Sequence, residues 1–261
     1  MPNLLEALEA NLHGHIAYVQ RQLPGMTVEN WDDLLLVDSH LPTDTFNKIA
    51  RARLRDADAH RRVSEAIGHF RSAGRPFAWW VGPCSQPSGL GRLLEAHGLQ
   101  PAESELGMAA GLTRLPTTHE FPAGLEIRRA RSREEVADFA DVTAANWDSP
   151  DPSVLAFYDM AAPLLLLPEC PMQLFVGYLD GRAAAAGELF LGGGVAGLHM
   201  VSTRREFQRR GIGLAMTWHL SDQGRRQGFT IATLQASEAG RGVYARIGYT
   251  ACCELIEYQP V

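Results

Sequence analysis

The sequence predicts a mixed α/β fold whose sheet is twisted and mainly antiparallel in the C-terminal half. The pair Asp180-Gly181 is typical of a type I′ turn, and Gly192-Gly193-Gly194 marks a second reversal of the chain. The strand-like segments that these two turns would join lie at 174–178, 183–190 and 195–201. Consecutive strands joined by tight turns pair antiparallel, so a sheet is expected here instead of a helical bundle.

Helices and further strands flank these hairpins. Leu125–Arg128 is typical of a first strand, and Ser132 with Glu135 forms a capping-box start for a helix. The remaining elements are predicted as helices over 211–226 and 240–247 and as strands over 230–235 and 251–258. The second half therefore mixes helices and strands.

The first half predicts a smaller α/β domain of related topology. Its helices are expected over 4–23, 59–73 and 90–98, and its strands over 33–40, 76–82 and 104–112. Pro116 and Pro122 bracket a polar run between two strand-like segments, which is typical of a linker. The expected domains are therefore 1–115 and 124–261, joined by the linker 116–123.

A faint internal repeat connects the two halves. The order strand, short helix, glycine, strand occurs near the end of each half, and it aligns Gly98 with Gly248 and Leu94 with Tyr244. The first half has no glycine-rich turn like the one described below. It is either a degenerate duplicate that has lost cofactor binding or a chance similarity.

Composition excludes several classes of function. The net charge is −6 and divides evenly, with 11 basic and 14 acidic residues in 1–122 and 13 and 16 in 123–261, so no basic half is available for nucleic acid. No apolar stretch approaches the ~20 residues that cross a membrane, and the N-terminus lacks signal-peptide features, so we expect a cytoplasmic protein. The 4 cysteines lack metal-ligand spacing and are expected to be reduced, without a metal.

The most informative stretch runs from a strand through a basic turn into a helix. Gly211 and Gly213 allow close backbone approach to a phosphate at a helix N-terminus, and Arg209 and Arg210 add positive charge. The glycine spacing differs from that of the dinucleotide fingerprint, and Leu214 follows where a P-loop requires lysine. A cofactor with a pyrophosphate, bound without lysine, is the remaining interpretation.

At these residues the sequence resembles the GNAT superfamily of acyl-CoA-dependent N-acetyltransferases. Its signature, Gln/Arg-x-x-Gly-x-Gly/Ala after a strand, is matched by Gln208, Gly211 and Gly213. A second block, 234–249, is similar to the strand and short helix with which the family ends, and it contains Tyr244. The resemblance covers about 124–261, and 1–115 enters only through the repeat.

The resemblance implies acetyl-CoA as co-substrate and a set of residues that hold it. Backbone groups of Val201 and Thr203 are expected to hold the pantetheine arm and the thioester carbonyl. Ser237 stands where the family usually has an asparagine, so a side-chain contact there is in doubt. The expected acetyl-CoA-binding residues are Val201, Thr203, Gln208, Arg209, Arg210, Gly211, Gly213, Leu214 and Ser237.

Three residues are candidates for proton transfer. The resemblance implies Tyr244 as the general acid, and it implies His199 as the base because some family members carry a histidine at this strand position. Strand alternation would place His199 on the same face as Gly197 and Val201. A buried structural histidine is the alternative, and Glu188, acting through water, is the second candidate for the base.

The expected activity is transfer of an acetyl group from acetyl-CoA to the amine of a small molecule, without an acyl-enzyme. Asp148 and Asp151 lie in a loop that would line the acceptor pocket, although turn-forming aspartates need no such role. The alternatives are an acetyltransferase acting on protein lysines or N-termini and a non-catalytic acyl-CoA-binding protein. The expected partner is a small-molecule amine, and a homodimer is compatible with the sequence.

Overall fold

The computed structural model describes residues 3–147 and 149–261, which group into two compact units. Unit 1 contains the chain up to Leu106 together with Cys253–Val261, and unit 2 is Gly107–Cys252. Two strands, β5 (Leu99–Gly111) and β11 (Thr250–Pro260), contribute residues to both units. The linker expected at 116–123 lies inside unit 2, and the division into domains 1–115 and 124–261 stays a prediction.

Unit 1 is an α/β layer structure with the strand order β1-β2-β3-β4-β11-β5. Strands β1, β2 and β3 are antiparallel, β3 and β4 are parallel, and β11 returns antiparallel to β4. Besides β5 and β11, its elements are α1 (Leu4–Gln22), β1 (Thr27–Asn30), β2 (Leu35–Asp38), β3 (Lys48–Ala50), α2 (Ala59–Ser72), β4 (Ala78–Val81) and α3 (Leu90–Ala96).

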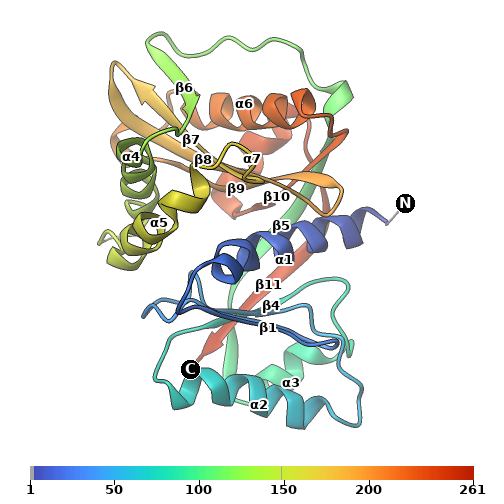
Figure 1. Ribbon diagram of the computed structural model, residues 1–261. Coiled ribbons are helices and arrows are strands. Elements are labelled where there is room, and N and C mark those ends of the chain that lie inside the picture. The colour runs from blue at the N-terminus through green and yellow to red at the C-terminus, as the bar shows by residue number, and fades with distance from the viewer. Residues whose placement is uncertain (1–2, 148) are drawn as a thin grey trace. The chain divides into compact units, whose positions relative to one another are not determined.

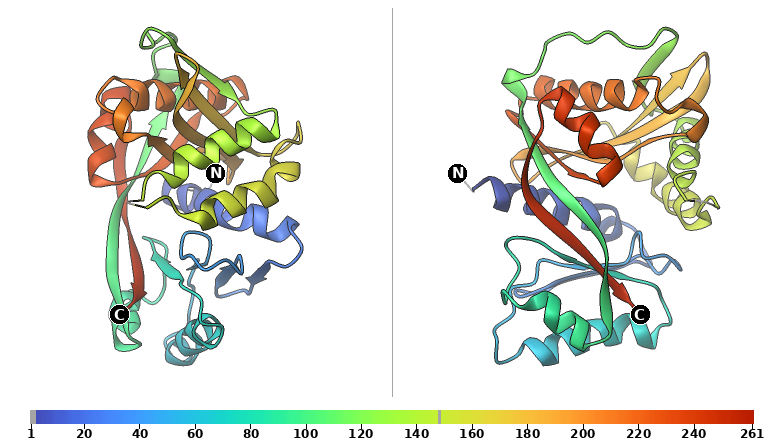
Figure 2. Two further views of the ribbon diagram at one scale, coloured as in Figure 1. Left: turned by 90° about the vertical axis from the view of Figure 1, so that its left-hand side faces the viewer. Right: turned by 180° about the vertical axis from the view of Figure 1, so that it is seen from behind.

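Helices cover both faces of the unit 1 sheet. Helices α2 and α3 pack on one face, where Phe70 and Phe77 stack with ring centroids 4.9 Å apart in the main hydrophobic cluster. Helix α1 packs on the other face through Leu8 and Leu12, which contact Leu255 of β11. Figure 1 and the two views of Figure 2 show α1 on one side of these strands and α2 with α3 on the other.

Unit 2 has the strand order β5-β10-β9-β8-β7-β6. Strands β6 to β9 are antiparallel neighbours, and β10 runs parallel to β9. Its further elements are the 3₁₀ turns η1 (Leu112–Arg114) and η2 (Arg205–Phe207), β6 (Leu125–Arg129), α4 (Arg133–Ala144), α5 (Pro152–Leu165), β7 (Met172–Leu179), β8 (Arg182–Gly192), β9 (Val195–Thr203), α6 (Ile212–Arg226), β10 (Ile231–Ala236) and α7 (Glu238–Ile247).

Both hairpins of unit 2 form at the predicted turns. Asp180 and Gly181 have φ angles of 49° and 79°, and Gly193 and Gly194 have 62° and 80°, as type I′ geometry requires. Helix α6 lies close against one face of this sheet, because a Cβ atom at Gly187 would stand 2.8 Å from the Leu220 side chain. Figure 1 shows α6 on that face and α4 with α5 on the other.

The predicted fold class is confirmed, and the differences concern helix α5 of 14 residues, which was not among the expected elements, and several short elements. Strands β1 and β3 were not predicted, because segments of 4 and 3 residues are too short to show a hydrophobic period. Helix α7 begins at Glu238, two residues before its predicted start, since the Ser237 hydroxyl accepts a hydrogen bond from the Gly240 amide and caps it. Among the described residues, no helix has the length and apolarity to cross a membrane.

Candidate functional site

The site of unit 2 is a cavity between two strands that diverge. Strand β9 pairs with β10 only from Ala196–Leu198 to Ala232–Leu234, although both strands continue further. Beyond the last pair lies a cavity of about 770 Å³. Its lining comes from the loop after α4, from β9 and the turn after it, and from helices α6 and α7 with the N-cap of α7: Asn146, Val201, Ser202, Thr203, Phe207, Gln208, Arg209, Gly211, Ile212, Gly213, Leu214, Thr217, Ser237, Ala239, Gly240, Val243, Tyr244 and Arg246.

The basic turn shapes one wall of this cavity. Gly211 is the N-cap of α6 with a left-handed φ of 81°, and no side chain caps the helix there. Gln208 fixes the turn, because its side-chain amide donates to the Thr203 carbonyl at 3.1 Å. The first amides of a helix have no intrahelical acceptor and carry partial positive charge, so this wall can bind an anion.

Gly213 keeps the same wall open. A Cβ atom at this position would meet only the Thr203 hydroxyl, at an ordinary 3.5 Å. The fold itself would tolerate a side chain at this position, so packing within the protein does not require glycine. The missing side chain leaves room for a ligand instead. The hydroxyl of Thr217 donates to the Gly213 carbonyl at 2.8 Å and anchors the first turn of α6.

Tyr244 reaches the cavity from α7. Its ring lies over Gly240, since a Cβ atom there would be 2.8 Å from the ring edge and 3.3 Å from the hydroxyl oxygen. The side chain is half-buried, and it lies beside Tyr249 with ring centroids 6.4 Å apart. A phenol held in this way can donate a proton to a group bound in the cavity.

A β-bulge in β9 changes the face that its side chains occupy. Ala186 pairs with Ser202 and Glu188 with His199, so the single residue Gly187 lies opposite both Met200 and Val201. Met200 takes a left-handed φ of 50° to accommodate the extra residue.

The expectation that His199 shares a face with Val201 is therefore wrong, because strand alternation fails at the bulge. His199 instead shares a face with Glu188 and Ser202.

Glu188 and His199 lie next to the cavity lining and not in it. Glu188 is 1% exposed, and the Tyr158 hydroxyl of α5 donates to its carboxylate at 2.6 Å. Burial, together with this carboxylate, holds the pKa of Tyr158 well above its usual value, so Tyr158 stays a hydrogen-bond donor. His199 is 7% exposed, and the nearest lining residue on its face of β9 is Ser202.

The structure brings most of the predicted site residues together. Of the twelve, those that line the cavity are Val201, Thr203, Gln208, Arg209, Gly211, Gly213, Leu214, Ser237 and Tyr244. Arg210 is exposed and lies over the Phe207 ring at 6.0 Å, outside the lining, as are His199 and Glu188. Asp151 caps α5 by accepting from the Ser153 amide at 2.8 Å, and Asp148 lies outside the described residues.

The sequence interpretation missed nine lining residues, among them Asn146, Ser202 and Arg246. Asn146 follows α4, in the loop where only the aspartates were considered. Ser202 reaches the lining because of the bulge, which no local pattern announces. Arg246 adds positive charge from α7, and its position two residues after Tyr244 in the second motif was the available signal.

Comparison with known proteins agrees with this geometry. Residues 135–249 match the sequence profile of the acetyltransferase (GNAT) family. A GCN5-related N-acetyltransferase from Kribbella flavida superposes with a TM-score of 0.71, at 20% identity over 95% of each chain. One from Sphaerobacter thermophilus gives 0.63 at 18% identity, over 93% of this chain and 84% of that one.

A tandem GNAT protein from the clavulanic acid biosynthesis pathway also superposes, with a TM-score of 0.65 at 12% identity over 97% of this chain and 92% of that one. A search of curated proteins finds no match. At these identities the solved structures establish the fold alone, and the sequence profile carries the assignment. Residues 135–249 are accordingly assigned as a GNAT acetyltransferase domain, and the solved N-acetyltransferases share its fold.

Proposed function

We propose that unit 2 transfers an acetyl group from acetyl-CoA to the amine of a small molecule by direct attack, without an acyl-enzyme. One observation carries this function. A single cavity joins the uncapped N-terminus of α6, the edge of β9 that β10 leaves unpaired, and the phenol of Tyr244. An anion site, a backbone edge and a proton donor are the three requirements for binding and cleaving a CoA thioester.

The lining fits the parts of CoA. The amides of Arg209, Gly211, Gly213 and Leu214 face the pyrophosphate, and the Arg209 and Arg246 guanidinium groups add charge at the rim. Past Leu198, the backbone of β9 is free to pair with the amides of the pantetheine arm, as a sheet edge pairs with an extended peptide.

The placement of the remaining groups supports a route for proton transfer. An alkylammonium acceptor has a pKa near ~10.4 and must lose a proton before its nitrogen attacks the thioester carbonyl. His199 accepts this proton through a water beside Ser202, with Glu188 as the alternative base. The Val201 amide donates to the carbonyl oxygen as its negative charge develops.

Tyr244 completes the transfer by protonating the sulfur. The C–S bond breaks once the new C–N bond has formed, the nitrogen releases its second proton to solvent, and the departing thiolate takes the phenol proton. A thiol titrates near ~8.5 and a phenol near ~10, so solvent readily returns a proton to the phenolate in the next step. Acetyl-CoA supplies the activated acyl group, and the products are the acetylated amine and free CoA.

The test is thiol release from acetyl-CoA in the presence of an amine panel that includes small amines, lysine peptides and peptides with free N-termini. Small-molecule acetylation predicts release with small amines and a loss of rate in Tyr244→Phe. Release with peptides alone would favour a protein acetyltransferase. Acetyl-CoA binding without any release would favour a non-catalytic acyl-CoA-binding protein.

A further inference from the structure

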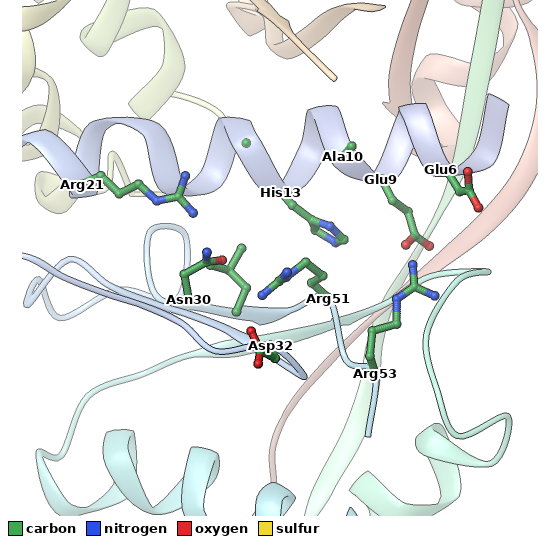
Figure 3. A pocket seen from close by; sticks show the side chains of 11 residues that line it. Glu6, Glu9, Ala10, His13, Arg21, Asn30, Asp32, Arg51 and Arg53 are labelled. Carbon is green, nitrogen blue, oxygen red and sulfur yellow. The ribbon is translucent and has the colours of Figure 1, made fainter. Parts of the chain in front are cut away.

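Unit 1 contains a separate cavity that the acetyl-transfer chemistry does not use. It has a volume of about 520 Å³, which is in the size range of small-molecule sites. It lies between α1 and the segment that includes β1 and β2 (Figure 3). The side chains that matter below are those of Glu9, His13, Arg21, Asn30, Arg51 and Arg53.

Three arginines line this cavity, and none of them forms an ion pair within the described part of the chain. Arg51 is held from one side only, because its guanidinium donates to the backbone carbonyls of Trp31 and Leu34. Its buried Nε has no hydrogen-bond partner among the described residues. A buried guanidinium nitrogen without an acceptor is costly, and within residues 3–147 and 149–261 no hydrogen bond occupies the Nη1 end of this guanidinium, where an anionic ligand could add hydrogen bonds and charge compensation.

The backbone at Arg51 is also unusual. Its φ of 54° lies in the left-handed region, which side chains other than glycine rarely adopt. Figure 3 shows the Arg51 head lying between His13 above it and Asn30 beside it. Backbone strain of this kind is concentrated at functional sites, and here it coincides with a guanidinium that lines a cavity.

The charges of the cavity are not evenly distributed. In Figure 3, Arg53 points up toward Glu9, so these two charges offset each other. At the other end of the cavity, Arg21 extends from α1 above Asn30, and Arg51 lies below His13 (Figure 3). Burial, followed by the charges of Arg51 and Arg53, lowers the pKa of His13 to about 4, so the imidazole is neutral. Asp32 also lies at this end, below Asn30 and Arg51 (Figure 3), so two arginines there face one carboxylate and an excess of one positive charge remains.

We infer that this end of the cavity binds the carboxylate of a small molecule, held by Arg51 and Arg21 with the Asn30 amide. A planar guanidinium matches the two oxygens of a carboxylate. A phosphate group offers a similar pattern of oxygens but carries up to two charges. The carboxylates of Glu6, Glu9 and Asp32 line the same cavity and repel a dianion more strongly than a monoanion.

The full chain is titrated calorimetrically with acetate, benzoate and succinate, with acetamide and benzamide as neutral controls and inorganic phosphate as the competing anion. We expect carboxylates to bind and the amides not to bind. Arg51→Met should weaken binding by about tenfold or more, the loss typical of a charged hydrogen bond. Because Arg51 also holds two backbone carbonyls, Arg21→Gln serves as a second variant: its side chain is exposed and a moderate loss of affinity is expected.

Two controls locate the binding. Arg55→Gln, an arginine with an 84% exposed side chain outside the cavity, and Gly213→Val, in the unit 2 anion site, should leave carboxylate affinity unchanged. A bound carboxylate should also raise the pKa of His13, measured by NMR titration. The inference is overturned if phosphate binds more tightly than every carboxylate, if no carboxylate binds, or if Arg21→Gln and Arg51→Met both leave the affinity unchanged.

Discussion

The short helix near the end of each half shows how similar local patterns serve different purposes. Helices α3 and α7 are both followed by a left-handed glycine, Gly98 with φ 80° and Gly248 with φ 117°, and then by a long strand. Leu94 of α3 is fully buried in the main core cluster of unit 1. The aligned Tyr244 of α7 is half-buried and lines the unit 2 cavity. The same position therefore supports the core in one unit and reaches a ligand site in the other.

The helix that connects two parallel strands also differs between the units: its N-terminus is open to a ligand in unit 2 and occupied by a carboxylate in unit 1. Helix α6 follows β9 and begins at an uncapped, left-handed Gly211. Helix α2 follows β3 and begins after Asp58, whose carboxylate pairs with Arg55 and Arg61 at that end of the helix. A carboxylate at a helix N-terminus occupies the place of an anionic ligand and repels a pyrophosphate. CoA binding is thus expected in unit 2 and not in unit 1.

The largest expected effect is from Gly213→Val. The Cβ atom has ordinary contacts within the protein, but the branched side chain fills the space that a pyrophosphate needs beside the α6 amides. Acetyl-CoA affinity, measured by calorimetry, should be lost in a folded variant. Gly68→Val is the matched change in unit 1, at an exposed position of α2 with open space around it, and should keep full affinity. Unchanged affinity in Gly213→Val would refute the assigned site.

Replacing the proton-transfer groups should slow catalysis without weakening binding. Tyr244→Phe keeps the ring over Gly240 and removes only the proton donor, so we expect a loss of ~10²-fold in kcat at nearly constant acetyl-CoA affinity. His199→Ala should lower kcat by a similar factor and remove the acidic limb of the pH–rate profile. If His199→Ala keeps its rate and profile while Glu188→Gln loses them, the base is Glu188.

Truncating the aligned position of unit 1 should affect stability and not binding. Leu94 is fully buried, so Leu94→Ala should lower the free energy of unfolding by about 2–5 kcal/mol. Tyr244→Phe should leave that free energy almost unchanged, because the half-buried ring is kept. Urea denaturation of both variants measures the contrast. Equal destabilisation by the two substitutions would remove the distinction between a core position and a site position.

The smallest expected effect is a pH dependence confined to unit 1. Burial, with the charges of Glu103 and Glu257, raises the pKa of Glu105 from 4.5 to about 7. Between these values the unfolded chain releases the proton and the folded chain keeps it, so stability falls as pH rises. Glu105→Gln should remove this fall, and its stability relative to wild type should increase from pH 5 to pH 8.

Urea denaturation at the two pH values measures this change, with the exposed Glu29→Gln as control. Acetyl-CoA affinity should be the same in both variants. A wild type whose stability does not fall relative to Glu105→Gln over this range would contradict the raised pKa.

Local signals in the sequence predicted most of the fold and much of the lining of the site. Turn residues such as Asp180-Gly181 and the cap Ser132 act within a few residues, so they can be recognised without tertiary structure. The β9 bulge could not be predicted, because it depends on pairing between Gly187 and a strand that follows it. For the same reason the face of His199 was wrong and Ser202 was missed.

The pairing of β11 with a strand of unit 1 could not be predicted from local sequence patterns either. Its residues are typical of a strand in any setting, and only the pairing of Ile256–Tyr258 with Trp79–Val81 decides where it belongs. The cavity of unit 1 gave no signal either, since its arginines are distributed over α1 and the segment after β3. Long-range pairing and the convergence of distant side chains are set by tertiary packing, which a short motif does not encode.

The number of acetyl-CoA molecules bound per chain tests the central claim most directly, because it separates the two units without assuming an acceptor. Calorimetric titration of the full chain should give one molecule per wild-type chain and none for Gly213→Val. Two molecules per wild-type chain would show that unit 1 also binds the cofactor, and one molecule retained by Gly213→Val would show that the cofactor does not depend on the α6 turn. Either result would contradict the account.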